Sequence, residues 1–492
     1  MANSPIGNQW KTLDTDLNRI SHIEYATAYV SRPLVAGGVA LAFIGVAALV
    51  GAVILGQGPG HLAVIFAAAF GAYMAINIGA NDVANNMGPA VGAKALTMGG
   101  AILIAIVFES AGALLAGGDV VSTISKDIID PVSMQDAHLF VWAMMAALIS
   151  SALWVNLATW IGAPVSTTHA VVGGVMGAGI AAAGFGAVNW PTMSAIAASW
   201  VVSPLLGGAI AALFLALIKT RIIYQDDKIT AARRWVPVLI GLMAGTFTTY
   251  LALKGLQRLI KIELGQAATF GLIIGVLCWL LARPLIRRQS EGLENRNRSL
   301  KTLFGPPLVI SAALLSFAHG ANDVANAVGP LAAIVHATQF GNFAAQVSIP
   351  IWVMIIGAFG ISFGLFLFGP RLIRMVGDQI TKLNPMRAFC VALSAAITVI
   401  LASGLGLPVS STHIAVGGVF GVGFYREWHM ERRLRALALS PDVKRIAPEE
   451  RRRRKLVRRS HFLTIVAAWV ITVPAAAAMS AVIFLLLNAI VD

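Results

Sequence analysis

The seven residues GANDVAN occupy positions 79–85 of the chain and recur unchanged at positions 320–326. Each copy lies within an apolar stretch long enough to enter a bilayer. A carboxylate and two amides at membrane depth are energetically unfavourable unless they face a cavity, a partner or a bound ion. Because these unfavourable polar residues occur in both apolar stretches, the two copies indicate a functional site around which the chain is organised.

The composition predicts an all-α polytopic membrane protein. Of the 492 residues 58% are hydrophobic and 12% are charged, and the mean hydropathy is +0.79. The apolar stretches predict about 12–13 transmembrane helices, the first at 34–56 and the last at 462–490. The net charge of +14 comes from loops between these stretches, so we expect contact with anionic lipid and no nucleic acid. The phosphate-loop motif of an ATP-driven pump is absent from the sequence.

Charge in the loops predicts the orientation. Basic residues dominate the segments 219–234, 283–301 and 426–459, which we place in the cytoplasm. The segment 117–136 carries four aspartates against a single lysine and belongs outside. The apolar stretches counted from these anchors put the N-terminus inside and the C-terminus outside a plasma membrane, which is the inner membrane in a Gram-negative cell. The two GANDVAN copies then run in opposite directions.

A second repeated phrase supports an inverted-topology repeat. PVSTTH at 164–169 corresponds to PVSSTH at 408–413. The offset is 241 residues from Asp82 to Asp323 and 244 residues from Ser166 to Ser410, so the order and spacing of both motifs are duplicated. We expect two re-entrant hairpin-like segments, near 166–186 and 410–425.

The domain organisation follows from these boundaries. The expected parts are a cytoplasmic amphipathic N-terminal arm at 1–33, an extra transmembrane helix at 34–61, a first transport repeat at 62–217, connecting helices and cytoplasmic loops at 218–302, and a second, inverted transport repeat at 303–492 that includes the basic loop 426–459.

The hydroxyl-rich phrases have the chemistry of an oxyanion site. Proline ends the preceding helix, and the hydroxyl residues then lie at the start of the next helix, where free backbone N–H groups and the positive dipole end point outward. This arrangement suits a tetrahedral anion. The alternative is that these side chains only cap a helix. The candidate ligands are Ser166, Thr167, Thr168, Ser410, Ser411 and Thr412.

The Asn-Asp phrases offer hard oxygen ligands for Na⁺ or a relayed proton. Their candidate residues are Asn81, Asp82, Asn85, Asn322, Asp323 and Asn326. Neighbouring glycines and prolines predict that both helices unwind here and free backbone carbonyls. The alternative is an interhelical clamp made by the asparagines. Glu109 is a third intramembrane acid whose counterpart at the offset of 241 would be Pro350; it either adds a cation or proton site or pairs with a neighbouring helix.

At these motifs the chain resembles the inorganic phosphate transporter family over roughly residues 62–490. The resemblance implies a secondary transporter, not an enzyme, that imports inorganic phosphate by cation symport through alternating access and uses no organic cofactor. It implies that the six hydroxyl residues bind phosphate, that the Asn-Asp residues bind the coupling cation, and that Asp82 and Asp323 also lie close to the substrate.

The resemblance further favours Na⁺ over H⁺ as the coupling ion. The phrases FES at 108–110 and SKDIID at 125–130 are similar to the sodium-coupled branch, and GFHDTAN, typical of the proton-coupled branch, is absent. Competing interpretations are a permease for sulfate or another tetrahedral oxyanion, a passive anion channel, and a sensor or scaffold that uses 426–459. Beyond phosphate, the cation and the bilayer, a second copy of the chain in a homodimer is a candidate partner.

Overall fold

The computed structural model describes residues 34–54, 60–130, 133–134, 136–161, 165–255, 262–340, 349–375, 383–438 and 459–491. The predicted arm at 1–33, Pro164 and the part of the basic loop at 439–458 lie outside the described residues. Almost all regular structure in the described part is helical, and one isolated bridge joins Ile129 to Val188. This agrees with the all-α fold class predicted from composition.

The first described helix covers Leu34–Ile54. The following helices are α2 (His61–Asn81), α3 (Val83–Gly92), α4 (Met98–Ala116), α5 (Gly118–Ser122), α6 (Ala137–Ile161), α7 (Thr167–Ala183), α8 (Trp190–Ile218), α9 (Lys228–Tyr250), α10 (Leu264–Gln289), α11 (Asn297–Leu303), α12 (Gly305–Phe340), α13 (Ile351–Met375), α14 (Pro385–Gly404), α15 (Ser411–Ala438) and α17 (Arg459–Val491).

Eleven helices in the described part are long and apolar enough to cross a membrane, fewer than the 12–13 predicted. The difference lies in the segments 166–186 and 410–425. The first of these is the short helix α7, and the second forms the start of α15. Helix α7 packs back on α6, and α15 packs back on α14, so each pair forms a hairpin.

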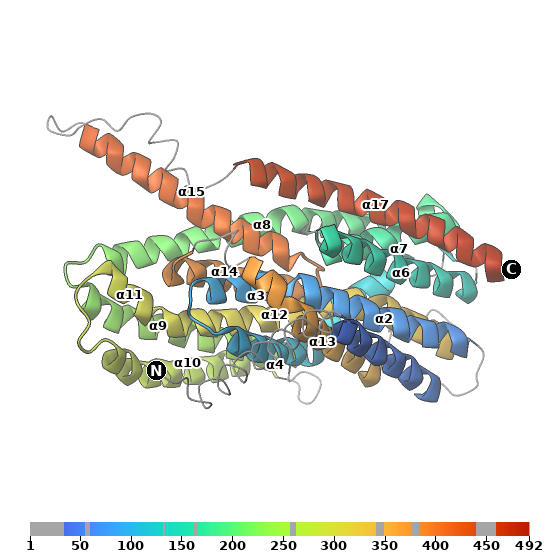
Figure 1. The fold of residues 1–492 in the computed structure, drawn as a ribbon, viewed down its shortest axis with the longest axis horizontal. Helices are drawn as coiled ribbons and strands as arrows, with labels where there is room; N and C mark the ends of the chain where they lie inside the picture. Colours follow the sequence, from blue (N-terminus) through green and yellow to red (C-terminus); the bar gives the residue numbers. More distant parts are fainter. Residues whose placement is uncertain are drawn as a thin grey trace, which may run out of the picture.

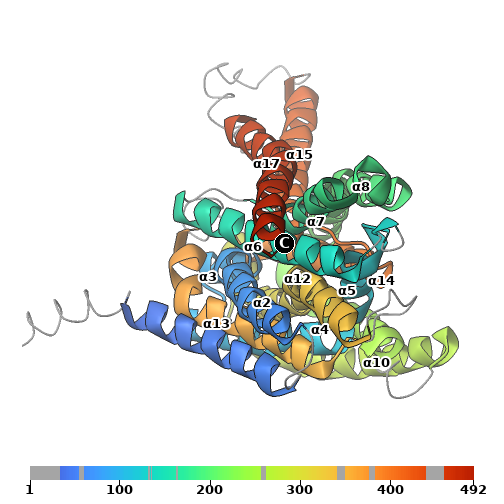
Figure 2. The same cartoon turned by 90° about the vertical axis from the view of Figure 1, so that its right-hand side faces the viewer.

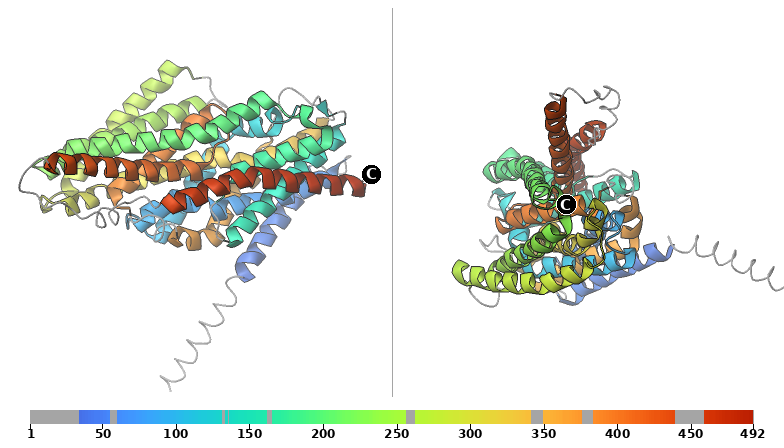
Figure 3. Two further views of the ribbon diagram at one scale, coloured as in Figure 1. Left: turned by 90° about the horizontal axis from the view of Figure 1, so that it is seen from above. Right: turned by 90° about the vertical axis from the view of Figure 1, so that its left-hand side faces the viewer.

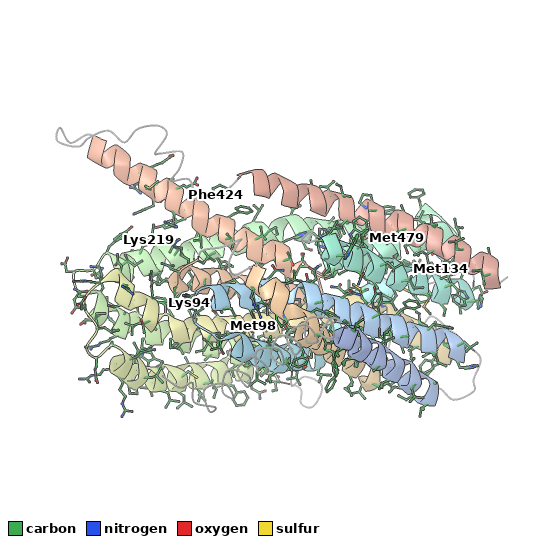
Figure 4. All side chains as sticks on the ribbon, viewed as in Figure 1. Lys94, Met98, Met134, Lys219, Phe424 and Met479 are labelled. Atoms are coloured by element: carbon green, nitrogen blue, oxygen red, sulfur yellow. The ribbon has the colours of Figure 1, made fainter. Side chains whose placement is uncertain are left out.

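The two ends of the molecule differ in charge as the loop analysis predicts. The α8–α9 connection and α11 lie at the left-hand end of Figure 1, as does the outer part of α15, whereas the C-terminus lies at the right. The basic segments are therefore gathered at one end. The acidic residue Asp136 lies close in sequence to Met134, which Figure 4 labels toward the right-hand end.

Helices of the two halves are exchanged in the packing. Helix α2 packs on α13, and the equivalent α12 of the second half packs on α4. Glycines allow these backbones to touch: a Cβ added to Gly79 would overlap the carbonyl oxygen of Ile361, and one added to Gly320 would overlap that of Glu109. In the same way α7 packs on α17, while α15 packs on α8. Each half is therefore completed by helices of the other half.

Helix α12 forms the centre and the connecting helices form the periphery. In the end-on view of Figure 2, α12 lies amid the other helices, and α10 and the Leu34–Ile54 helix lie at the edge. Accordingly, 89% of the most apolar window of α12 is buried, against 17% for each of the two outer helices. The views in Figure 3 show the Leu34–Ile54 helix along the outside of the body. Lipid contact is thus expected mainly at these outer helices.

The predicted unwinding at both GANDVAN phrases is wrong for the second copy. Helix α12 continues without a break from Gly305 to Phe340, through Gly320 and Pro330. In the first copy the only interruption is Asp82, which separates α2 from α3. The glycines here provide space for a neighbouring backbone, so the sequence pattern reflects close helix packing instead of freed carbonyl groups.

Candidate functional site

The two hairpin tips meet the two GANDVAN phrases in the interior of the protein. Asp82 lies between α2 and α3, and Asp323 lies in the middle of α12. The hydroxyl residues lie where α7 and α15 begin. The aspartates and the six hydroxyl residues are all at most 3% exposed. Structure thus brings both predicted residue sets to one buried place.

Each aspartate accepts a hydrogen bond from the hairpin tip of its own half. The Thr167 hydroxyl donates to Asp82 Oδ2 at 2.8 Å, and the Ser411 hydroxyl donates to Asp323 Oδ2 at 3.0 Å. The preceding serines cap the helices: the hydroxyl oxygen of Ser166 accepts from the backbone N–H of His169 at 3.2 Å, and Ser410 makes the same bond at 3.3 Å. The first hydroxyl residue of each phrase is therefore a helix cap, as the alternative interpretation predicts. The second hydroxyl residue instead donates a hydrogen bond to an aspartate.

The last asparagine of each phrase reaches the tip of the opposite half. Asn85 donates from Nδ2 to the Thr412 hydroxyl at 2.9 Å. Asn326 donates from Nδ2 to the Thr168 hydroxyl at 3.1 Å. Thr412 in turn donates to Asp82 Oδ1 at 3.3 Å. The two halves are thereby joined through one polar network.

The first asparagine of each phrase bonds to the end of the first hairpin arm instead. Asn81 donates to the Thr159 hydroxyl at 2.7 Å, and Asn322 donates to the Ser403 hydroxyl at 2.9 Å. Asn322 Oδ1 also accepts from the backbone N–H of Val409 at 3.2 Å. These contacts have the geometry of the interhelical clamp. The clamp interpretation therefore fits the first asparagine of each phrase, whereas the last asparagine lies at the hairpin tips.

Sequence reasoning missed His319 and Asn86. His319 Nε2 lies 2.8 Å from Asp323 Oδ2, and its Nδ1 lies 3.3 Å from Glu109 Oε1. Asn86 donates to the same Glu109 oxygen at 3.1 Å. Ligand atoms of Asp82, His319 and Asp323 lie within 4.8 Å of one another. The available signal was the spacing of His319 four residues before Asp323, which places both on one helix face.

The expected counterpart of Glu109 is wrong. Packing pairs α4 with α13 as equivalent helices, and the residue that occupies the place of Glu109 is Ile361, at an offset of 252 residues. At the same offset the hydroxyls of Ser110 and Ser362 lie 2.8 Å apart. The offset of 241 fails because α13 begins further along the chain after the second GANDVAN phrase than α4 does after the first. Glu109 is still an asymmetric feature, since its counterpart is apolar.

The family follows from comparison with known proteins. A family model described as "Phosphate transporter family" matches residues 78–480, which include both GANDVAN phrases and both hydroxyl phrases. The chain belongs to this family. It is therefore a membrane transporter and not an enzyme, as its resemblance in sequence implies.

The alignments with related proteins cover most of this chain. A "Putative phosphate permease" of Helicobacter pylori is 52% identical over 427 residues, covering 86% of this chain and 80% of the relative. One of Pyrococcus abyssi is 36% identical over 417 residues, covering 85% and 96%. The solved structure titled "The sodium-dependent phosphate transporter" is 34% identical, covers 87% of this chain and 99% of its own, and gives a TM-score of 0.78.

Proposed function

We propose that this transporter imports inorganic phosphate together with a cation, Na⁺ in preference to H⁺, by alternating access across the plasma membrane. The observation that carries the proposal is the convergence of two buried carboxyl groups with two hydroxyl-bearing helix starts from opposed halves. The solved relative described as sodium-dependent supports the choice of Na⁺.

The acid side of the site offers oxygen atoms to a cation. Four buried oxygens in this region have no hydrogen-bond partner: Asn86 Oδ1, Glu109 Oε2, Asp323 Oδ1 and Asn326 Oδ1. Buried acceptors without a partner are unfavourable, and a hard cation such as Na⁺ satisfies them. A fifth member of the proposed ligand set is Asp82, whose carboxylate lies close to that of Asp323.

The hydroxyl side explains how cation and anion are coupled. Thr167 and Ser411 donate to the aspartates, so those O–H groups are engaged by carboxylate oxygens. A cation bound to the carboxylates replaces the hydroxyls as their partner and releases the O–H donors for phosphate. It also removes a repulsion of about 4 kcal/mol per pair of unit charges at 4 Å and an effective dielectric of 20. Cation and phosphate should therefore bind together.

The exchanged packing supports the proposal of alternating access. Each hairpin tip belongs to one half and contacts an asparagine of the other. Relative movement of the two halves would therefore open one side of the site while the polar network holds on the other, as in other inverted repeats.

Proteoliposomes that contain the purified transporter test the proposal. An inward Na⁺ gradient should drive uptake of radiolabelled phosphate above the level reached with a proton gradient, and excess sulfate should leave uptake largely unchanged. Uptake driven only by protons would contradict Na⁺ coupling. Flux that needs no gradient would indicate a channel, and strong competition by sulfate would indicate another oxyanion as substrate.

Substitutions at the aspartates connect this activity to the site. Asp82→Asn and Asp323→Asn keep the size of the side chain but remove the charge that attracts the cation, so we expect each variant to lose Na⁺-dependent uptake. Asp226→Asn is the matched control, because Asp226 is an exposed acid in the α8–α9 connection, outside the buried site. Full Na⁺-dependent uptake by both aspartate variants would refute the assignment.

A further inference from the structure

A second concentration of charge lies away from the central site, in a pocket at the basic end of the molecule. The pocket has a volume of about 320 Å³, at the lower end of the range of small-molecule sites. Five cationic side chains line it: Lys219, Arg298, Lys301, Arg387 and Arg426. Its described lining includes no Asp or Glu.

The cations converge from four separate helices. Lys219 follows the end of α8, Arg298 and Lys301 lie on α11, Arg387 lies in the first turn of α14, and Arg426 lies on α15. Figure 4 labels Lys219 near the left-hand end of the molecule, with Phe424 of α15 above it. Helices far apart in sequence thus place like charges around one small volume, an arrangement that repulsion opposes unless an anion occupies it.

Three of the cations are partly shielded from solvent. Lys219, Arg387 and Arg426 are half-buried, and within the described residues none of the five forms an ion pair with a carboxylate. The start of α14 adds to the positive potential, because Asn384 and Met386 line the pocket and the N-terminal dipole of this 20-residue helix is directed there. The charge is thus built into the fold.

Tyrosine and tryptophan side chains beside the pocket favour a position at the depth of lipid headgroups. Lys219 Nζ lies 4.9 Å from the centre of the Tyr425 ring, and Arg432 lies 5.5 Å from the Trp428 ring. Rows of tyrosine and tryptophan mark the boundary between hydrocarbon and water. Both a soluble cytoplasmic anion and the headgroup of an anionic lipid can reach a site at this level.

We propose that this pocket binds a phosphate-bearing anion with several negative charges, separately from the transported phosphate. The guanidinium group of arginine forms two parallel hydrogen bonds with phosphate oxygens, and the ammonium group of lysine adds a compact positive charge. Five cations exceed what one phosphate dianion neutralises, so a diphosphate or a pair of lipid phosphates fits better. Such an anion links α8 and α11 to both arms of the α14–α15 hairpin.

Thermal unfolding of the full chain tests the site, with every protein carrying Asp323→Asn so that binding at the central site does not interfere. One arm titrates pyrophosphate onto protein in neutral detergent. The other compares nanodiscs of phosphatidylcholine with nanodiscs that also contain phosphatidylglycerol. The pocket variant is Arg387→Gln/Arg426→Gln. The matched control is Arg287→Gln/Arg288→Gln, which removes two exposed cations of α10 at the same end, outside the pocket.

The reference protein and the control should melt at higher temperature when the anion is present. The pocket variant should lose about tenfold in affinity for each cation removed, and it should melt above the reference when no anion is present, since repulsion is relieved. A response to pyrophosphate identifies a soluble ligand, and a response to phosphatidylglycerol alone identifies a lipid. Equal responses of pocket variant and control, or no response in either arm, overturn the proposal. If the double variant does not fold, Lys219→Gln replaces it under the same criteria.

Discussion

His319 lies between two buried carboxyl groups, one from each half, and this network has no equivalent at the positions related by the repeat. Its partners are Glu109 and Asp323, and all three side chains are at most 1% exposed. The position equivalent to His319 in the first half holds Ile78, and the position equivalent to Glu109 in the second half holds Ile361. The two halves therefore share their hydroxyl tips and aspartates but differ in what supports the aspartate.

This asymmetry predicts a stability pattern. Removing one partner of a buried ionic network costs about 3–5 kcal/mol, whereas replacing both partners with apolar side chains is often close to neutral. We expect His319→Leu to lower the unfolding temperature strongly and the double variant His319→Leu/Glu109→Leu to recover part of the loss, as measured by thermal unfolding in detergent. Ile78→Leu is the control, with a cost below about 1.5 kcal/mol. A double variant less stable than His319→Leu would contradict this.

At the level of the helix, the glycines of the repeated phrase determine how closely the exchanged helices approach. Gly320 allows α12 to lie against the backbone of Glu109 on α4, and Gly112 of α4 lies against Phe317 in return. The same reciprocal contact joins Gly79 and Gly364 to α13 and α2. Because Asp323 follows Gly320 by one turn, this contact also places the acid.

A methyl group at this contact should separate the two helices. Gly320→Ala would overlap the Glu109 carbonyl, so we expect a loss of about 1–3 kcal/mol together with a marked loss of phosphate uptake. Gly99→Ala is the matched control, because Gly99 lies on α4 with open space around it; there alanine should stabilise by about 0.4–1 kcal/mol. Thermal unfolding and uptake on both variants test this, and equal effects of the two would rule out the packing role.

For the whole molecule, the two ends differ in the sign of their charged residues. The basic connections lie at the end opposite the C-terminus, and Met134, close in sequence to Asp136, lies toward the C-terminal end. Positive charge is generally retained in the cytoplasm during insertion, so we expect the basic end to lie inside. The proposed anion pocket then faces the cytoplasm or its lipid leaflet.

Single cysteines test this orientation. With Cys278 and Cys390 replaced by alanine, Asp136→Cys should react with a membrane-impermeant maleimide on intact cells, whereas Arg288→Cys should react only after permeabilisation. Both positions are exposed, so access to the reagent depends on the side of the membrane. The reverse pattern would invert the predicted topology.

The sequence by itself determined the fold class, the inverted repeat and the main motif residues. Polar residues are energetically unfavourable in apolar helices, so those that occur there are easily recognised in the sequence. The duplication of two motifs in the same order is also recognisable from the sequence alone. It also favoured re-entrant segments after both PVS phrases.

Only the tertiary structure decided which polar groups meet. It separated Asn81 and Asn322, which fasten hairpin arms, from Asn85 and Asn326, which reach the opposite tips. It also paired Glu109 with His319 and gathered five cations from four helices into one pocket. Such contacts depend on where helices cross and how closely their glycines let them approach, and a linear pattern of residue types does not contain that geometry.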